Sequence, residues 1–302
     1  MVEIIMLEKV RKNEYGFYEL KNKPTAKEQE ENFVEEYYQK EEGGHEKVYP
    51  SEALGFFENK ATQREYVIRK IVGSNRKLKV LDIGCGEGYL LKHFMDGGNE
   101  VCGIDFSRYG IENKNPEVIP FFIQEDCYKV LQDLIDQKKK FDVVNTDDTL
   151  DMVQDPEKLL GLIKQVTNKN SVIACKISNN YSDFQLQLLK DGIVSKEFWL
   201  DEKGHPIYFN KNGFVKYFEK NGFKCLGVYA ERLIELNLLN KYTNYYENPE
   251  VGKECWKTTF IIENLLHNLS MENTIEIMKL FGEMGLGREL LGIFCIDEKE
   301  DE

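Results

Sequence analysis

The chain has 302 residues, of which 41% are hydrophobic and 31% are charged, so it can form a large core beneath a solvated surface. A formal net charge of −13 and an isoelectric point of about 5.0 argue against nucleic acids and anionic membrane surfaces as partners. Seven cysteines without a C-x-x-C pair, and no signal peptide or membrane-spanning run, predict a reduced cytosolic protein without a catalytic metal.

Residues 1–75 are polar, rich in tyrosine and helical in their spacing, with Phe33 and Tyr37 four residues apart on one expected face. We predict that this segment is a helical cap, and that the regions around Tyr38 and Tyr49 fold over a ligand as a lid. Ordinary helix packing explains the same aromatic residues equally well.

Short apolar runs alternate with helical patterns after this cap, which predicts a mostly parallel sheet covered on both faces. Helices are expected to begin at two polar residues, Asp155 (followed by Pro156) and Asn210. The core domain should span residues 76–230, a helical insertion residues 231–286, and the last strand with an acidic tail residues 287–302. Strands are expected at residues 79–83, 100–104, 120–124, 141–145, 171–177, 223–229 and 290–296.

The first predicted strand of the sheet runs directly into the glycine-rich stretch Gly84-Cys85-Gly86-Glu87-Gly88 and then into a helix. Glycines let the backbone approach a ligand closely, and the helix presents free N–H groups beside it. A dinucleotide fingerprint needs a small residue at its sixth position, where this chain has Tyr89. The acidic Glu87 would also repel a pyrophosphate, whereas it suits a cationic sulfonium cofactor.

Two further acidic residues follow the next strands. Asp105 lies about twenty residues beyond the turn, where a carboxylate can accept hydrogen bonds from both ribose hydroxyls. Asp126, in the stretch QEDC, can accept a hydrogen bond from an adenine amino group. Together they predict a nucleoside pocket.

This series of motifs resembles class I S-adenosyl-L-methionine (SAM)-dependent methyltransferases: VLDIGCGEG, IDFS, QEDC and FDVVNTDDTLDMVQDPEKLL occur in the family's order. The resemblance covers residues 60–230. It implies a Rossmann-like α/β fold with a seven-stranded sheet of five parallel strands and a terminal pair, SAM as cofactor and S-adenosyl-L-homocysteine as product. The implied cofactor-binding residues are Asp82, Gly84, Cys85, Gly86, Glu87, Gly88, Asp105, Phe106, Asp126, Cys127 and Thr146.

The chain departs from the family patterns after its fourth predicted strand. Where many small-molecule members have Leu-Glu-His, this chain has Leu150-Asp151-Met152, so the histidine base of that motif is absent. Asn145-Thr146-Asp147-Asp148 replaces the N-P-P-Y motif, which argues against adenine bases and glutamine side chains as acceptors.

Candidate catalytic residues are His205, Asp147 and Asp148, of which one would remove the proton from an acceptor hydroxyl. In the stretch GHPIYFNKNGF, His205, Tyr208 and Phe209 resemble the family's H-x-x-Y/F-F segment near the active-site mouth. Tyr208 and Tyr38 are therefore candidate substrate-binding residues. Alternatively, His205 only fastens its loop and the aspartates only cap a turn or bind acceptor hydroxyls.

The tyrosine-rich cap before this core also resembles bacterial methyltransferases of surface-polysaccharide biosynthesis. That resemblance implies O-methylation of a small polar acceptor, a sugar- or phosphate-linked precursor of a capsular polysaccharide or its phosphoramidate group. Two alternatives remain open: a SAM-binding regulatory protein without turnover, and an NAD-dependent dehydrogenase. Whether the chain forms a homodimer also stays open.

Overall fold

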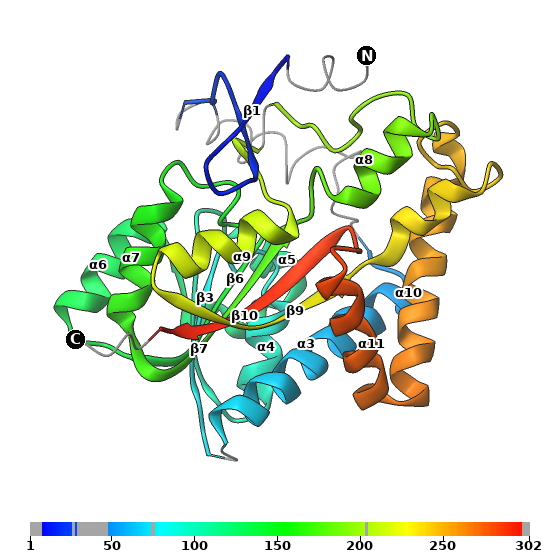
Figure 1. Cartoon of the computed structure of the whole chain (residues 1–302). Helices are drawn as coiled ribbons and strands as arrows, with labels where there is room; N and C mark the ends of the chain where they lie inside the picture. Colours follow the sequence, from blue (N-terminus) through cyan, green and yellow to red (C-terminus); the bar gives the residue numbers. More distant parts are fainter. Residues whose placement is uncertain (1–7, 26–27, 29–47, 74–75, 203–204, 298–302) are drawn as a thin grey trace.

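The computed structural model describes residues 8–25, 28, 48–73, 76–202 and 205–297 (Figure 1). At its centre is a seven-stranded sheet with the strand order β5-β4-β3-β6-β7-β10-β9. The strands are β3 (Lys79–Ile83), β4 (Glu100–Asp105), β5 (Phe122–Gln124), β6 (Phe141–Asp147), β7 (Thr167–Ser178), β9 (Phe223–Glu231) and β10 (Glu289–Ile296).

Five of these strands, β3 to β7, pair in parallel, whereas β10 is antiparallel to both β7 and β9. The predicted sheet of five parallel strands with a terminal pair is therefore confirmed. Its strand order changes direction at β3, with β4 on one side and β6 on the other. Ligands of open α/β sheets bind beside the carboxyl ends of the strands at such a point.

Helices cover both faces of the sheet (Figure 1). Leu81 and Ile83 of β3 pack in a core with α6, α7 and α9, whereas Val80 packs in a second core with α3, α4 and α5. This alternation follows from the two-residue period of a strand. The helices are α3 (Ser51–Val72), α4 (Tyr89–Asp96), α5 (Tyr109–Lys114), α6 (Cys127–Asp136), α7 (Pro156–Val166), α8 (Asp183–Lys190), α9 (Lys211–Lys220), α10 (Gly252–Leu269) and α11 (Met271–Glu283).

Two helices begin where the sequence predicted. The Asp155 side chain accepts a hydrogen bond from Lys158 N at the start of α7, and the Asn210 side chain accepts one from Gly213 N at the start of α9. Each side chain satisfies a backbone N–H group that the first turn of a helix leaves without a partner.

The amino-terminal segment contains a small sheet that the sequence did not predict. Strands β1 (Val10–Lys12) and β2 (Tyr18–Leu20) form a hairpin, and β2 pairs with β8 (Ile207–Tyr208). Phe17 lies just before β2 and contacts Phe209, and the centroids of the two rings are 4.4 Å apart. The described part of the cap is thus this hairpin followed by the helix α3, and the strands are too short to produce a clear two-residue pattern.

The insertion between β9 and β10 is helical, as predicted. It contains the 3-10 helices η3 (Leu233–Leu239) and η4 (Pro249–Val251), followed by α10 and α11. Helix α11 packs against β9, and α10 packs against α3. In the ranges that the structure describes, every helix is too short or too polar to cross a membrane.

Candidate active site

The glycine-rich turn connects β3 to α4 and is fastened to the end of β4. Gly84 N and Cys85 N both donate hydrogen bonds to the Ile104 carbonyl, and Gly86 N donates one to Asp105 Oδ2 at 2.9 Å. Gly84, Gly86 and Gly88 all have positive φ angles, of 72°, 54° and 78°. This backbone conformation favours glycine, which explains the spacing of the three glycines.

Two of these glycines also allow close packing. A Cβ atom on Gly84 would lie 2.1 Å from Thr149 Oγ1, and one on Gly88 would lie 2.9 Å from Ile111 Cγ1. The single hydroxyl hydrogen of Thr149 Oγ1 is shared between the carbonyl groups of Asp147, at 2.9 Å, and Ile83, at 3.2 Å. The turn is therefore held against the segment that follows β6.

Acidic side chains surround the turn. Asp82 is buried and accepts a hydrogen bond from Asn145 Nδ2 at 2.7 Å. Burial and the negative charge of Asp147 raise the pKa of Asp82 to about 7. Burial also raises the pKa of Asp105, although backbone N–H groups of Ser107 and Gly86 oppose this shift. A positively charged ligand would relieve the excess negative charge.

The Tyr49 side chain lies beside the glycine-rich turn. Its ring packs edge-on against Phe57, with centroids 5.1 Å apart, and against Tyr89, at 6.2 Å. Burial, together with the charge of Glu87 and a hydrogen bond to it, raises the pKa of the Tyr49 hydroxyl. The Tyr49 ring thus packs beside the turn, a contact that fits both a lid and ordinary helix packing, and Tyr38 lies outside the described residues.

The other predicted cofactor-binding residues differ in how accessible their side chains are to a ligand. Phe106, at the end of β4, is 55% exposed and available to a ligand. The Asp126 carboxylate accepts a hydrogen bond from Lys129 N and so begins α6, which competes with the predicted adenine contact. The remaining three, Cys85, Cys127 and Thr146, have buried side chains. Cys85 and Cys127 pack in the two hydrophobic cores, whereas Thr146 Oγ1 has no hydrogen-bond partner among the described residues. Their contacts with a cofactor stay predictions.

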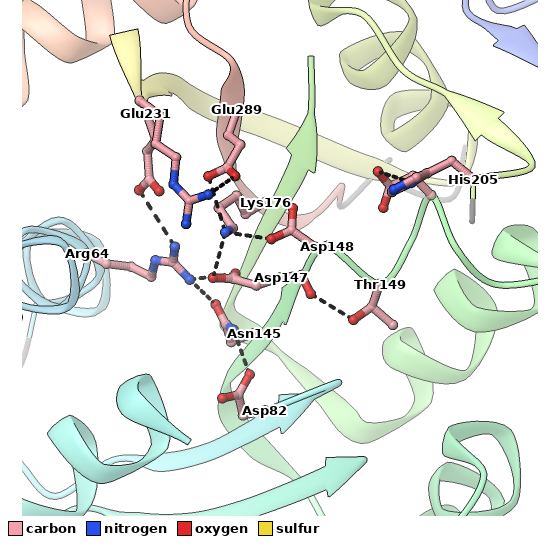
Figure 2. A network of polar contacts seen from close by, with 12 residues as sticks. Arg64, Asp82, Asn145, Asp147, Asp148, Thr149, Lys176, His205, Glu231 and Glu289 are labelled. Atoms are coloured by element: carbon pink, nitrogen blue, oxygen red, sulfur yellow. Dashed lines mark hydrogen bonds and ion pairs between the residues drawn. The ribbon is translucent and has the colours of Figure 1, made fainter. Parts of the chain in front are cut away.

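A network of charged side chains lies at the carboxyl ends of β6, β7 and β9 and at the amino end of the antiparallel strand β10 (Figure 2). Arg64, from α3, donates hydrogen bonds to Asn145 Oδ1 and Asp147 Oδ1, both at 2.6 Å. It also lies 3.7 Å from Glu231. Although burial opposes ionisation, Arg64 and Lys176 hold the pKa of Asp147 below its usual range. Asp147 is therefore an ionised carboxylate that is already paired with two cations, which makes it a poor base.

Lys176 is the second cation of the network. Its Nζ atom lies 2.7 Å from Asp148, 3.3 Å from Glu289 and 3.9 Å from Asp147. Glu289 also pairs with Arg232 at 2.8 Å. Burial raises the pKa of Asp148 to about 6 despite the opposing charge of Lys176. Asp148 is thus the more basic carboxylate of the predicted pair.

The predicted base His205 lies at the same edge of the sheet, in the loop before β8 (Figure 2). Its Nδ1 atom is 3.5 Å from an oxygen of Asp151, which is completely buried. Burial lowers the pKa of His205, but the contact with Asp151 and the negative charges of Asp151, Asp201 and Asp148 together outweigh this, so the pKa lies above its usual value. A histidine next to a carboxylate can act as a general base.

Tyr208 does not fit its predicted role in substrate binding. The ring is completely buried in β8, and its hydroxyl donates a hydrogen bond to the Asp201 carbonyl at 2.6 Å. Of the residues in the H-x-x-Y/F-F stretch, His205 therefore lies at this edge of the sheet, whereas the Tyr208 hydroxyl holds the loop.

The sequence interpretation missed six charged residues of the site: Arg64, Asp151, Lys176, Glu231, Arg232 and Glu289. One signal was available, because Lys176 is a lysine within the apolar run SVIACKI. A charged residue in a buried strand needs a partner of opposite charge. Over the described part of the chain, no group of three or more His, Cys, Asp and Glu residues is arranged to hold a metal ion.

Comparison with curated proteins gives partial matches. Ubiquinone biosynthesis O-methyltransferases of Rhodopseudomonas palustris (strain HaA2) and Pelagibacter ubique are 27% and 30% identical over 129 and 115 residues. These matches cover 42% and 36% of this chain, and 50% and 46% of the two relatives. The chain thus spans about half the length of the curated relatives that it matches.

A protein of Methanocaldococcus jannaschii, provisionally named as a ribosomal RNA large subunit methyltransferase, is 27% identical over 186 residues, which are 52% of this chain and 46% of that protein. Among solved structures, a SAM-dependent methyltransferase from Archaeoglobus fulgidus aligns with a TM-score of 0.47 and 18% identity, covering 79% of this chain and 94% of that one. The family model described as "Methyltransferase domain" matches residues 59–228, which is more than half of the chain. The chain therefore belongs to the methyltransferase domain family.

Proposed function

We propose that the protein is a SAM-dependent methyltransferase that methylates a hydroxyl group of a small polar acceptor. The observation that carries this proposal is the glycine-rich turn fastened to Asp105 at the carboxyl edge of the sheet, within a methyltransferase domain. Asp82, Glu87 and Asp105 provide three acidic side chains at or beside this turn. They suit the cationic sulfonium of SAM and would repel the pyrophosphate of NAD.

Each part of the cofactor has candidate partners. The glycine-rich turn and Asp82 would hold the methionine part, and Asp105 would accept hydrogen bonds from the ribose hydroxyls. Exposed Phe106 offers an aromatic face for the adenine. When bound, SAM supplies an electrophilic methyl group, so the protein has only to align the acceptor oxygen and remove its proton.

His205 is the proposed base. Its side chain is 20% exposed, so Nε2 can reach an acceptor, while Nδ1 faces Asp151. The acceptor hydroxyl would give its proton to His205 as its oxygen bonds to the methyl group, and the bond from that methyl group to the sulfonium sulfur would break to leave S-adenosyl-L-homocysteine. Asp148 is the alternative base, because its raised pKa of about 6 makes it a better proton acceptor than Asp147.

The charge balance of the site favours one form of acceptor. Asp147, Asp148, Glu231 and Glu289 face three cations, namely Arg64, Lys176 and Arg232, and Asp151 faces His205. A phosphate would add further negative charge, whereas hydroxyl groups would donate hydrogen bonds to the carboxylates. A sugar-like acceptor is therefore favoured over a phosphate-bearing one. The link to capsular polysaccharide rests on the sequence resemblance alone.

Measuring the Tm with SAM, S-adenosylhomocysteine, NAD or NADP tests which cofactor the protein binds. A ligand at about 100 times its Kd stabilises the native state by about 2.7 kcal/mol, which raises the Tm by several degrees. We expect this shift with SAM and S-adenosylhomocysteine only. A shift with NAD alone would overturn the proposal in favour of the dehydrogenase.

Turnover separates an enzyme from a regulatory protein. We expect S-adenosylhomocysteine to form with polyol acceptors, and His205→Ala to reduce its rate at least about a hundredfold while SAM still raises the Tm. Binding of SAM without turnover of any sugar, nucleotide sugar or phenol would instead support the non-catalytic alternative.

A further inference from the structure

We propose that Asp151 is the positioning residue for His205: its carboxylate accepts a hydrogen bond from Nδ1–H and so leaves the Nε2 lone pair facing the acceptor. This inference rests on the proposed function, in which His205 removes the acceptor proton. Asp151 lies four positions after the end of β6, where the expected family motif would have placed a glutamate.

Burial determines what Asp151 can do. None of its side-chain surface is exposed, so it cannot touch an acceptor. Among the described residues, neither of its carboxylate oxygens has a hydrogen bond of ordinary geometry. A buried carboxylate without a partner is costly, and the His205 ring at 3.5 Å is the cationic group paired with it. Small movements that shorten this contact would satisfy both groups.

The rest of the His205 environment supports the same arrangement. The backbone N–H of His205 donates to the Asp201 carbonyl at 3.3 Å, which holds the loop. Three carboxylates act on the ring: Asp151 directly, and Asp201 and Asp148 through their charges. Asp201 is exposed and Asp148 pairs with Lys176, so Asp151 is the partner that can fix the ring orientation.

This arrangement makes two predictions for the wild-type protein. The neutral ring should carry its proton on Nδ1, because Nδ1 faces the carboxylate. Turnover should rise with pH through the pKa of His205, since only the neutral ring accepts a proton. That pKa lies above the usual value because the contact with Asp151 and the charges of Asp151, Asp201 and Asp148 together outweigh the effect of burial.

Nitrogen-15 NMR of the histidine rings tests the proposal directly. The chain has four histidines, and His205→Gln assigns the signal of interest. We expect the Nδ1–H form in the wild type. In Asp151→Asn, the His205 pKa should fall by about one unit, and the rising limb of the pH–rate profile should fall with it. Asp201→Asn is the matched control, since it removes a charge near the ring without removing the buried partner.

The outcomes separate the two proposals. An Nε2–H ring in the wild type, or the same small pKa change in Asp151→Asn and Asp201→Asn, would overturn the role of Asp151. The wild-type spectrum decides the matter if Asp151→Asn does not fold. If the Nδ1–H form and the pKa change are found but no acceptor is methylated, the pairing stands and the proposed reaction fails.

Discussion

Gly84 combines a positive φ of 72° with a close approach to Thr149, and the two effects can be separated by mutation. Gly84→Ala should lower the free energy of unfolding by about 2–4 kcal/mol, because the new methyl group meets Thr149 Oγ1 at 2.1 Å and the backbone is strained. Gly98→Ala is the matched control: its φ is 77°, but nothing lies within 4 Å of the added Cβ. It should cost about 1 kcal/mol. Equal losses in urea unfolding would mean that the contact with Thr149 is unimportant.

Asp148 lies in a left-handed conformation, with a φ of 47°, and its pKa is raised to about 6. A raised carboxyl pKa stabilises the fold fully below the unfolded pKa of about 4, and this contribution is lost as pH rises through about 6. Asn also tolerates the left-handed conformation. The stability of Asp148→Asn relative to wild type should therefore increase between pH 4 and pH 7.

Partial exposure limits the size of this pH effect to about 1–2 kcal/mol. Urea unfolding at several pH values would measure it, with exposed Asp133→Asn as the control that should show no such trend. A difference that stays flat from pH 4 to pH 7 would contradict the raised pKa of Asp148.

Helix α10 is joined to α3 by a buried ion pair. Lys60 Nζ lies 2.8 Å from Glu263 Oε2, and both side chains are less than 10% exposed. Removing one partner leaves a buried charge, so Lys60→Met alone should cost about 3–5 kcal/mol of unfolding free energy, as should Glu263→Leu alone. The double substitution should recover most of that loss.

The two single variants should differ in stability, because Glu263 also accepts a hydrogen bond from Leu233 N at 3.2 Å. Glu263→Leu should therefore destabilise the protein somewhat more than Lys60→Met. Urea unfolding of the four proteins gives the coupling energy between the two side chains. Additive losses in the double variant would mean that the pair contributes no interaction energy of its own.

The elements that could be predicted from the sequence are those with local signals. Strand β3 and helices α7 and α9 were predicted because an apolar run, Asp155 and Asn210 mark them. The hairpin of β1 and β2 was missed because three-residue strands carry no period, and the pairing of β2 with β8 joins residues far apart in the sequence. Local patterns contain no information about such a contact.

In the candidate site too, the features with a local sequence signal could be predicted, and the contacts between distant residues could not. The glycine-rich turn and Asp105 are readable because their spacing is fixed by one strand, one turn and one helix. His205 and Asp151 are separated by more than fifty residues, which include α7, β7 and α8, so only the structure brings them together. Lys176 and Glu289 meet only through the antiparallel pairing of β7 with β10.

At the scale of the whole molecule, the ionic network links parts of the chain that serve different purposes. Arg64 comes from the amino-terminal helix α3, Asp147 and Lys176 from the parallel core, and Glu231 and Glu289 from the terminal strand pair. The helical insertion leaves the sheet immediately after Glu231 and returns immediately before Glu289. The ends of the insertion are therefore tied to the proposed acceptor side, so changes in the insertion should affect acceptor binding more than cofactor binding.

The net charge of −13 bears on the choice between a small acceptor and RNA, the substrate class suggested by the name of the M. jannaschii relative. Affinity for a nucleic acid comes mainly from cations that neutralise phosphates. The densest basic run is Lys138-Lys139-Lys140, and Lys140 Nζ already donates hydrogen bonds to the carbonyls of Gln165 and Thr167 near the end of α7. Two exposed lysines remain in this run.

We therefore expect no binding of a labelled ribosomal RNA fragment in fluorescence anisotropy at protein concentrations up to about 10 µM in 150 mM salt, where non-specific complexes of basic proteins form at about 1–100 µM. The double variant Lys138→Glu/Lys139→Glu should give the same flat curve as wild type and should keep its Tm shift with SAM. Micromolar binding by the wild type that this variant loses would contradict the expectation, since it would make the basic run an RNA contact. The charged surface would then have to be reconsidered as a docking face, because local cations would outweigh the mean charge of the molecule.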